Sequence, residues 1–270
     1  MKRVLIALAA ATTLLAQAQG FPGSKPITFV VPFAAGGPTD LVARQLGEAM
    51  RKSMGQGANF VVDNTVGAGG TIGATKVARA ANDGYTLLLH HIGMSTSPAL
   101  YRNMQYKTLE DFEYLGMINE VPMTLIGKPG LPANNYAELV KWMEANKGKI
   151  NLANAGLGAV SQLCGMMLER AMGVKLTAVP FQGTAPAMNA LLGGQVDILC
   201  DQTTQTIPQI KAGNVKFYGV TTKNRIKALP DAPTLAEQGL KGFEVVVWHG
   251  IYAPKGTPKD ATEKFNAALR

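Results

Sequence analysis

The residues best placed for chemistry in this sequence carry almost no side chain. The apolar run Ile27–Phe33 is typical of a buried strand, and Pro38 begins a helix-like segment, where proline loses no needed N–H. The loop between them would offer a ligand mainly backbone. Unpaired N–H groups at a helix N-terminus bind anions, so we predict an anion site here. Its contacts would be Phe33, Ala34, Ala35, Gly36, Gly37 and Thr39.

The same arrangement recurs twice further along the chain. The runs Asn151–Ala153 and Ala178–Phe181 each precede a loop of small or polar residues and a helix-like segment. Ligands of open α/β sheets bind beyond the carboxyl ends of strands, so two facing sheets would enclose a small molecule. None of the loops contains Lys or Arg, and neutral N–H donors hold a carboxylate without a buried cation. The contacts predicted here are Ala155, Gly158, Ala159, Ser161, Phe181, Gln182, Gly183 and Thr184.

Two histidines stand at the end of a further predicted strand, Tyr85–His90: His90 is its last residue, and His91 follows directly. Side chains alternate along a strand, so His90 and His91 should face opposite sides. We predict that His91 and the nearby Ser95 contact the ligand; the alternative is one buried and one solvated histidine. Asp40 is interpreted as a first-turn acid that complements the helix dipole, with reception of an ammonium group as the alternative.

An exported α/β hydrolase that uses Ser161 or Cys164 is the alternative function. Ser161 lacks the flanking glycines of a nucleophile elbow, and Cys164 lies on the apolar face of a predicted helix, where a thiolate is disfavoured. We therefore expect no catalytic residue. No acid lies at ligand spacing from a histidine, and Gly67–Gly73 has isoleucine where a dinucleotide motif needs glycine. Neither a metal site nor a cofactor is expected.

Strand-length apolar runs alternate with amphipathic segments along the whole chain. One helix is especially clear, because apolar residues recur at helical spacing from Val160 to Met172 and Gly173 follows. Such alternation predicts an α/β fold with mainly parallel sheets flanked by helices. The two cysteines, Cys164 and Cys200, have two interpretations that stay open here: a disulfide, or two small buried side chains.

The N-terminus has the features of a secretory signal peptide. Lys2 and Arg3 precede an apolar run that ends in small residues near Ala18, and the run is shorter than the roughly 20 residues of a membrane span. We expect residues 1–18 to be removed and the mature protein to lie outside the cytoplasm, which the resemblance described below narrows to the periplasm. Without Lys2 and Arg3, the 26 basic residues fall to 24 against 18 acidic ones. The basic residues are scattered along the sequence, so the resulting net charge of +6 does not favour nucleic acid as a partner.

Several segments resemble one protein family. They are PITFVVPFAAGGPTDLVAR, VVDNTVGAGGTIGATKVARAANDGYTLL, NAGLGAVSQL, VPFQGTAPAMNALLGGQVDILCD, ALPDAPTLAEQG and VVWHGIYAPKGTP. In this order they are similar to the Bug-type periplasmic solute-binding proteins, the receptors of tripartite tricarboxylate transporters. The resemblance implies a type II-like periplasmic binding protein with two α/β domains joined by crossing strands and a ligand cleft between them.

The resemblance also implies boundaries, a ligand and partners. Domain 1 would comprise residues 25–122 plus about 226–270, and domain 2 residues 123–225. The loops would hold one carboxylate through backbone amides and ordered water, and Asp201 matches an acidic residue of the family. The ligand would be a small organic (di)carboxylate, and HHIGMSTSPALY is similar to members that take up aromatic ones such as terephthalate.

The partners implied by the resemblance are the permease subunits of such a transporter. The receptor itself would be a monomer, and signalling to a sensor kinase is an alternative role that the sequence does not separate from transport. Family members continue beyond the position of Arg270, so the C-terminal part of domain 1 is expected to be truncated.

Overall fold

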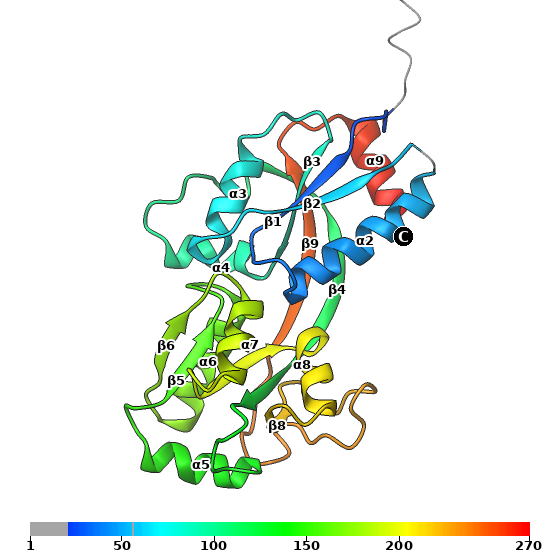
Figure 1. Cartoon of the computed structure of the whole chain (residues 1–270). Helices are drawn as coiled ribbons and strands as arrows, with labels where there is room; N and C mark the ends of the chain where they lie inside the picture. The colour runs from blue at the N-terminus through cyan, green and yellow to red at the C-terminus, as the bar shows by residue number, and fades with distance from the viewer. Residues whose placement is uncertain (1–20, 56) are drawn as a thin grey trace, which may run out of the picture.

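The computed structural model describes residues 21–55 and 57–270. The expected signal peptide lies outside these residues. Two α/β halves are placed one above the other, and two long strands run between them (Figure 1). Within the described residues, no helix combines the length and the apolar character needed to cross a bilayer.

The first half is a sheet with helices on both faces. Its strands lie in the order β2-β1-β3-β9-β4; β1 is parallel to β2 and β3, and β9 is antiparallel to its neighbours. The elements of this half are β1 (Ile27–Val31), α2 (Pro38–Met54), β2 (Phe60–Asn64), the 3-10 turn η1 (Ala68–Gly70), α3 (Thr71–Ala78), β3 (Thr86–His91), α4 (Gly93–Leu100), β9 (Val246–Pro254) and α9 (Lys259–Ala268).

The second half repeats this plan. β5 is parallel to β6 and β7, whereas β4 is antiparallel to β7 and β8. The strands that precede the three loops are therefore parallel to their neighbours as expected, and the antiparallel connecting strands make both sheets mixed. The elements are α5 (Tyr136–Ala145), β5 (Asn151–Asn154), α6 (Val160–Met172), β6 (Thr177–Pro180), α7 (Thr184–Leu192), β7 (Ile198–Gln202), α8 (Thr203–Lys211) and β8 (Lys216–Val220).

The strand β4 (Phe112–Gly127) belongs to both halves. It pairs with β9 as far as Pro122, and from Met123 onward it pairs with β7 and β8. The sequence predicts two extended segments separated by Pro122, but they form one strand. Proline has no N–H to donate to a ladder, which is tolerated here because β4 changes partners at this point.

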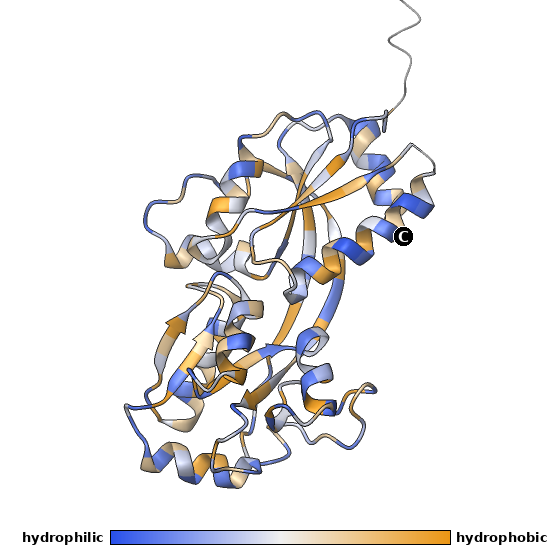
Figure 2. Ribbon diagram, in the orientation of Figure 1, coloured by the Kyte–Doolittle hydropathy of each residue, from blue (hydrophilic) through white to orange (hydrophobic). Residues whose placement is uncertain are grey.

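Alternating side chains build a separate apolar layer on each face of both sheets. In β1, Phe29 packs with residues of α2 and α9, whereas Val30 packs with residues of α3 and α4. In β7, Cys200 packs on the side of α5 and α6, and Leu199 on the side of α7. Figure 2 shows the hydrophobic colour concentrated on the strands and the hydrophilic colour on the outer helix faces.

The chain returns to the first half later than the sequence indicates. A return near residue 226 is expected, but Leu235, Leu240 and Phe243 pack in the same core as Met123 and Leu125 of the second half. Residues 226–245 contain few strand or helix signals, so the sequence offers nothing to assign them to a sheet. Their packing places the return in β9, next to β4.

Candidate functional site

The three predicted loops meet between the halves, beyond the ends of β1, β5 and β6. A cavity of about 10 Å3 lies among them, roughly the space that one water molecule needs. Phe33 of the first half packs with Ala155 and Ala159 of the second in a small buried apolar cluster. The cavity is lined by Phe33, Gly37, Pro38, Thr39, His91, Ala155, Val160, Ser161, Thr184 and Gln202. Residues from all three loops therefore face one space.

Asp40 organises the first loop. Its buried carboxylate accepts hydrogen bonds from the Gly36 N–H (2.9 Å), from two nitrogens of Arg44 (3.0 Å each) and from the Asn64 amide (3.0 Å). Asn64 also donates to the carbonyl oxygen of Phe33 at 3.0 Å. Both carboxylate oxygens thus accept hydrogen bonds from the loop, α2 and β2, which disfavours the alternative role of receiving an ammonium group.

These bonds also decide the charge of Asp40. Burial acts to raise its pKa, but the hydrogen bonds from Arg44, Gly36 and Asn64 and the charge of Arg44 outweigh burial, so the pKa lies below its ordinary value. The carboxylate is therefore ionised at neutral pH and holds the loop in one conformation.

Side chains of β5 and α6 hold the second loop. The bonds run from the Ala155 N–H to Ser161 Oγ (2.9 Å), from the Gly156 N–H to Asn154 Oδ1 (2.9 Å) and from the Gly158 N–H to Gln162 Oε1 (3.1 Å). The N–H groups of the predicted contacts Ala155 and Gly158 are therefore bonded inside the loop. The donors left at this edge are the first N–H groups of α6, which have no partner within the helix.

The third loop touches the first one across the boundary between the halves. The Ala34 N–H donates to the carbonyl oxygen of Gln182 at 2.9 Å. Gly183 has a φ of +146°, and a Cβ at this position would lie 2.8 Å from the Ala34 nitrogen. At the start of α7, Thr184 Oγ1 donates to Gln205 Oε1 (3.2 Å), and Gln205 Nε2 donates to the Thr184 carbonyl (3.1 Å).

Three helices, α2, α6 and α7, therefore begin at the cavity. Each helix N-terminus carries N–H groups without intrahelical partners and about half a positive charge. Among the described residues that line the cavity, none is Lys or Arg. This arrangement favours a carboxylate held by main-chain donors.

All three histidines of the chain gather beside the first loop. The Phe33 ring stacks on His91 with centroids 4.5 Å apart and meets His90 edge-on at 5.5 Å. His91 and His249 are paired across β3 and β9, with ring centroids 6.3 Å apart. The alternative with one solvated histidine is wrong, because helices cover both faces of the sheet and both His90 and His91 are buried.

Hydrogen bonds assign the tautomers of the first two rings. His91 Nδ1 accepts from the Gly93 N–H (2.9 Å), and His90 Nδ1 accepts from the His91 N–H (2.8 Å), so each ring carries its proton on Nε2. Burial lowers the pKa of His90 to about 3, helped by the proximity of His249. Burial and the other two histidines also lower the pKa of His91. His91 is thus a neutral ring, protonated on Nε2, at the cavity wall.

His249 connects the crossing strands to the first loop. Its Nδ1 lies 2.8 Å from Asn119 Oδ1 on β4, which assigns the ring proton to Nδ1, and its Nε2 lies 3.4 Å from Thr39 Oγ1. Burial lowers the pKa of His249 to about 4. Asn119, His249 and Thr39 therefore link the strands that join the halves to the start of α2.

Further contacts between the halves surround this site, and the sequence did not indicate them. Tyr101 Oη donates to the Leu157 carbonyl (2.9 Å), and Thr96 Oγ1 donates to the Gly158 carbonyl (3.2 Å). Gly69, in the glycine-rich turn, lies so close that a Cβ there would be 1.9 Å from the Leu157 carbonyl oxygen. The glycine-rich turn of the first half therefore reaches across to the second half.

Ser95 lies apart from the other predicted contacts. It lines a groove of about 610 Å3 on the first half, together with Met94, Tyr114 and Trp248, and it does not line the central cavity. Ser95 falls early in α4, a helix that the sequence did not indicate because Gly93 and Pro98 lie within it.

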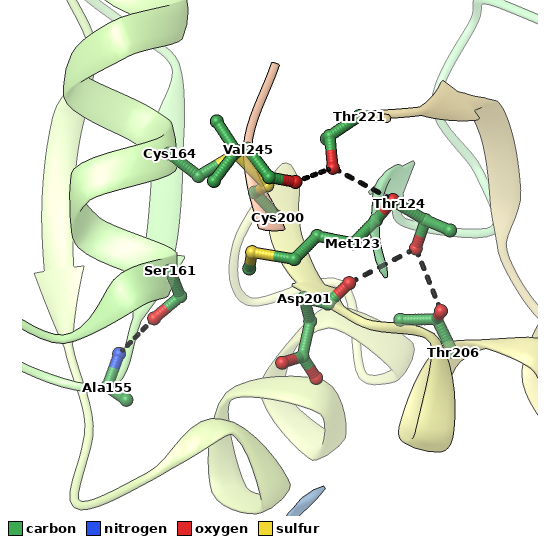
Figure 3. Close-up of a disulfide and its surroundings, with 10 residues drawn as sticks. All are labelled: Met123, Thr124, Ala155, Ser161, Cys164, Cys200, Asp201, Thr206, Thr221 and Val245. Atoms are coloured by element: carbon green, nitrogen blue, oxygen red, sulfur yellow. Dashed lines mark hydrogen bonds between the residues drawn. A yellow bond between two sulfur atoms is a disulfide. The ribbon is translucent and has the colours of Figure 1, made fainter. Parts of the chain in front are cut away.

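The two cysteines form a disulfide between α6 and β7, which settles the alternatives left open by the sequence (Figure 3). This bond removes Cys164 as a candidate nucleophile. Ser161 accepts the Ala155 N–H, and no histidine bonds to it among the described residues. In the part of the chain that the structure describes, no three His, Cys, Asp or Glu side chains are grouped to hold a metal ion.

Strand ends supply three of the site residues that sequence reasoning missed. Asn64 ends β2, Asn154 ends β5 and Gln202 ends β7. Asn154 directly follows apolar residues, whereas Asn64 and Gln202 each follow an apolar run after one intervening aspartate. Polar residues at the ends of apolar runs are therefore the signal that would have identified all three.

Comparison with known proteins agrees with this geometry. Residues 42–270 match the TctC family, described as the tripartite tricarboxylate transporter family receptors. The chain belongs to this family. The receptor is 55% identical to the periplasmic binding protein BugD, with a TM-score of 0.87 over 90% of this chain and 81% of BugD.

Two solved structures of similar receptors contain ligands. MatC of Rhodopseudomonas palustris, with bound malate, is 41% identical, with a TM-score of 0.86 over 92% of this receptor and 84% of MatC. A second R. palustris protein, with adipate, is 32% identical, with a TM-score of 0.88 over 93% and 83% of the two chains. The receptor thus has the two-domain fold of periplasmic binding proteins, and the family is one of solute-binding proteins.

Proposed function

We propose that this receptor captures a small organic dicarboxylate between its two halves in the periplasm and delivers it to the permease subunits of a tripartite tricarboxylate transporter. The observation that carries the proposal is that three helix N-termini meet at one cavity. No Lys or Arg lines this cavity among the residues that the structure describes. Malate in MatC and adipate in the second similar structure support this ligand class.

The predicted contacts divide into three roles. The first N–H groups of α2, α6 and α7 grip one carboxylate. Ser161 and Gly183 fix the loops from which two of these helices start. His91 donates from Nε2 to the remainder of the ligand, and Phe33 holds its ring in place by stacking.

Binding is coupled to closure of the two halves. The ligand first meets the loops of one half, and the loops of the other then complete the enclosure. Only contacts that form on closing favour the closed form, and the Ala34–Gln182 hydrogen bond is one of them. A closed receptor is then the form that the permease subunits recognise, and export by the predicted signal peptide places the receptor in the right compartment.

A thermal-shift panel tests the ligand class. L-malate, succinate, adipate and terephthalate are compared with acetate and glycine, each at a concentration of millimolar order. A ligand that binds only the native state raises the melting temperature in proportion to the logarithm of its concentration. At least one dicarboxylate should do so, and acetate should not. If terephthalate gives the largest shift, the ligand is aromatic; if no carboxylate gives a shift, the proposal fails.

A further inference from the structure

Asp201 is a buried acid whose carboxylate has no hydrogen-bond partner within residues 21–55 and 57–270. It is fully buried at the end of β7, and among the described residues neither carboxylate oxygen has a hydrogen-bond partner. Figure 3 shows the carboxylate pointing away from the Cys164–Cys200 disulfide, with no bond drawn to either side-chain oxygen. An ionised carboxylate in such surroundings is strongly unfavourable, because burial removes water and no hydrogen bond replaces it.

The position of Asp201 is next to the proposed carboxylate grip. Gln202, the following residue, and Thr184, at the start of α7, both line the central cavity. Asn154 Nδ2 and Gln202 Oε1, at the ends of β5 and β7, are also buried without a hydrogen-bond partner in the described part of the chain. Unpaired buried polar atoms are rare in folded proteins, and a group of them beside a cavity indicates a place that ligand or water completes.

Among the residues that the structure places, no charged side chain compensates Asp201. It is paired in register with Thr124 of β4, and α7, which lies on the same face, contains no ionisable residue. Lys211 of α8 and Arg170 of α6 lie in the last turns of their helices, and Glu120 of β4 is exposed. Burial raises the pKa of Asp201 to about 7; the Gln202 N–H and the Thr184 hydroxyl lie near the carboxylate without bonding to it, and they oppose the effect of burial only in part.

We infer that Asp201 carries a proton when the carboxylate is bound, so that the receptor takes up a proton together with its anionic ligand. Two carboxylates that share one site do not both ionise readily. The proton comes from solvent, no covalent bond changes, and the neutral acid donates its O–H to the ligand or to a water between them. This inference rests on the proposed function, but part of its test needs no ligand.

The ligand-free test compares the wild type with Asp201→Asn between pH 4 and pH 9. The folded protein binds the extra proton between the unfolded pKa, about 4, and the folded value near 7, so this acid lowers stability as the pH rises through that range. Relative to the wild type, the variant should therefore gain melting temperature from pH 4 to pH 8, by roughly 5 °C or more. A difference that does not change with pH would overturn the inference.

Asp197→Asn is the matched control for this comparison. Asp197 precedes the same strand and forms an ion pair with Lys128 at 2.7 Å. Loss of this ion pair in Asp197→Asn should lower the melting temperature at pH 8, whereas Asp201→Asn should raise it.

The ligand test uses calorimetry with L-malate and succinate between pH 6.5 and pH 8.5. Wild-type affinity should fall above pH 7, by up to about tenfold per pH unit, and the binding heat should depend on the ionisation enthalpy of the buffer. Asp201→Asn should bind with neither dependence. Binding that is independent of pH in the wild type, or a folded variant that binds nothing, contradicts the inference and leaves the proposed function standing. If no carboxylate binds at any pH, the proposed function fails, and the ligand-free comparison still decides whether Asp201 holds the proton.

Discussion

The backbone N–H of Ala34 donates a 2.9 Å hydrogen bond to the carbonyl oxygen of Gln182, and this bond joins two loops that are far apart in the sequence. Ala34 follows the first strand of one half, and Gln182 follows a strand of the other. Each loop was predicted separately as an anion grip. Their direct contact means that the proposed carboxylate grip is complete only when the two halves meet.

Closure should be blocked by a methyl group at Gly69. In Gly69→Ala the new Cβ would lie 1.9 Å from the Leu157 carbonyl oxygen, a backbone atom of the other half, and we expect separation of the halves to relieve this overlap. We expect dicarboxylate affinity to fall by at least about tenfold, because the closed state is no longer accessible. Calorimetry measures the affinity. In small-angle scattering, the radius of gyration of the variant with ligand should be larger than that of the wild type with ligand.

Gly173→Ala is the control for that substitution. Gly173 has a φ of +64°, close to the +61° of Gly69, and nothing lies within 4 Å of a Cβ there. Both variants should lose roughly 1–2 kcal/mol from left-handed backbone strain. Only Gly69→Ala should lose affinity; equal affinities would show that the turn does not limit closure.

The carboxylate of Asp40 should matter for stability and for binding. Asp40→Asn leaves the Gly36 N–H or Arg44 without its acceptor, and we expect a loss of about 1–3 kcal/mol in the free energy of unfolding. The pKa of Asp40 is lowered in the folded protein, so its stabilisation is present above the unfolded pKa and is lost as the pH falls through the folded one. Urea unfolding at pH 7 and pH 3 should therefore show a smaller difference between wild type and variant at the lower pH.

The disulfide should contribute strongly to stability and little to ligand recognition. It closes a loop with a sequence separation of 36, for which the chain-entropy relation gives about 4 kcal/mol. The double variant Cys164→Ala with Cys200→Ala, and the reduced wild type, should both melt at lower temperature than the oxidised protein. If reduction leaves the melting temperature unchanged while free-thiol titration confirms two thiols, the bond has no such role.

The buried histidines should make the protein less stable in acid. The pKa values of His90 and His249 lie below the value of about 6.5 in an unfolded chain, so the unfolded state binds more protons between that pH and about 4. Stability contributed by each neutral ring is therefore lost as the pH falls from 6.5. His249→Gln should show a shallower decline than the wild type in urea unfolding between pH 7 and pH 4.5, and an unchanged slope would contradict the assignment.

The elements of the site could be predicted from the sequence better than its hydrogen bonds. The strand–loop–helix pattern around Gly37 and Thr184 depends on local signals, namely apolar runs, small residues and helix starts. The internal bonding of Ala155 by Ser161 depends on how one side chain turns within its own loop, and periodicity carries no such information. Contacts between the halves, such as that of Tyr101 with Leu157, depend on the relative orientation that β4 and β9 impose on the two sheets.

The segment around Leu235 and Phe243 shows a second limit of the sequence. These residues are apolar but lie in no regular strand or helix, and only tertiary packing assigns them to the second half. The position of Ser95 is a third case. The sequence places Ser95 just after β3, near the cleft, but the chain turns there into α4, and Ser95 lies with Trp248 in a separate groove.

A crystal structure of the receptor with the dicarboxylate that gives the largest thermal shift tests the central claim most directly. One carboxylate should lie among the N-termini of α2, α6 and α7, with its oxygens about 2.7–3.2 Å from main-chain nitrogens and with no lysine or arginine in contact. A ligand seated in the groove beside Trp248, or held by basic side chains while the three helix starts stay unoccupied, would contradict it.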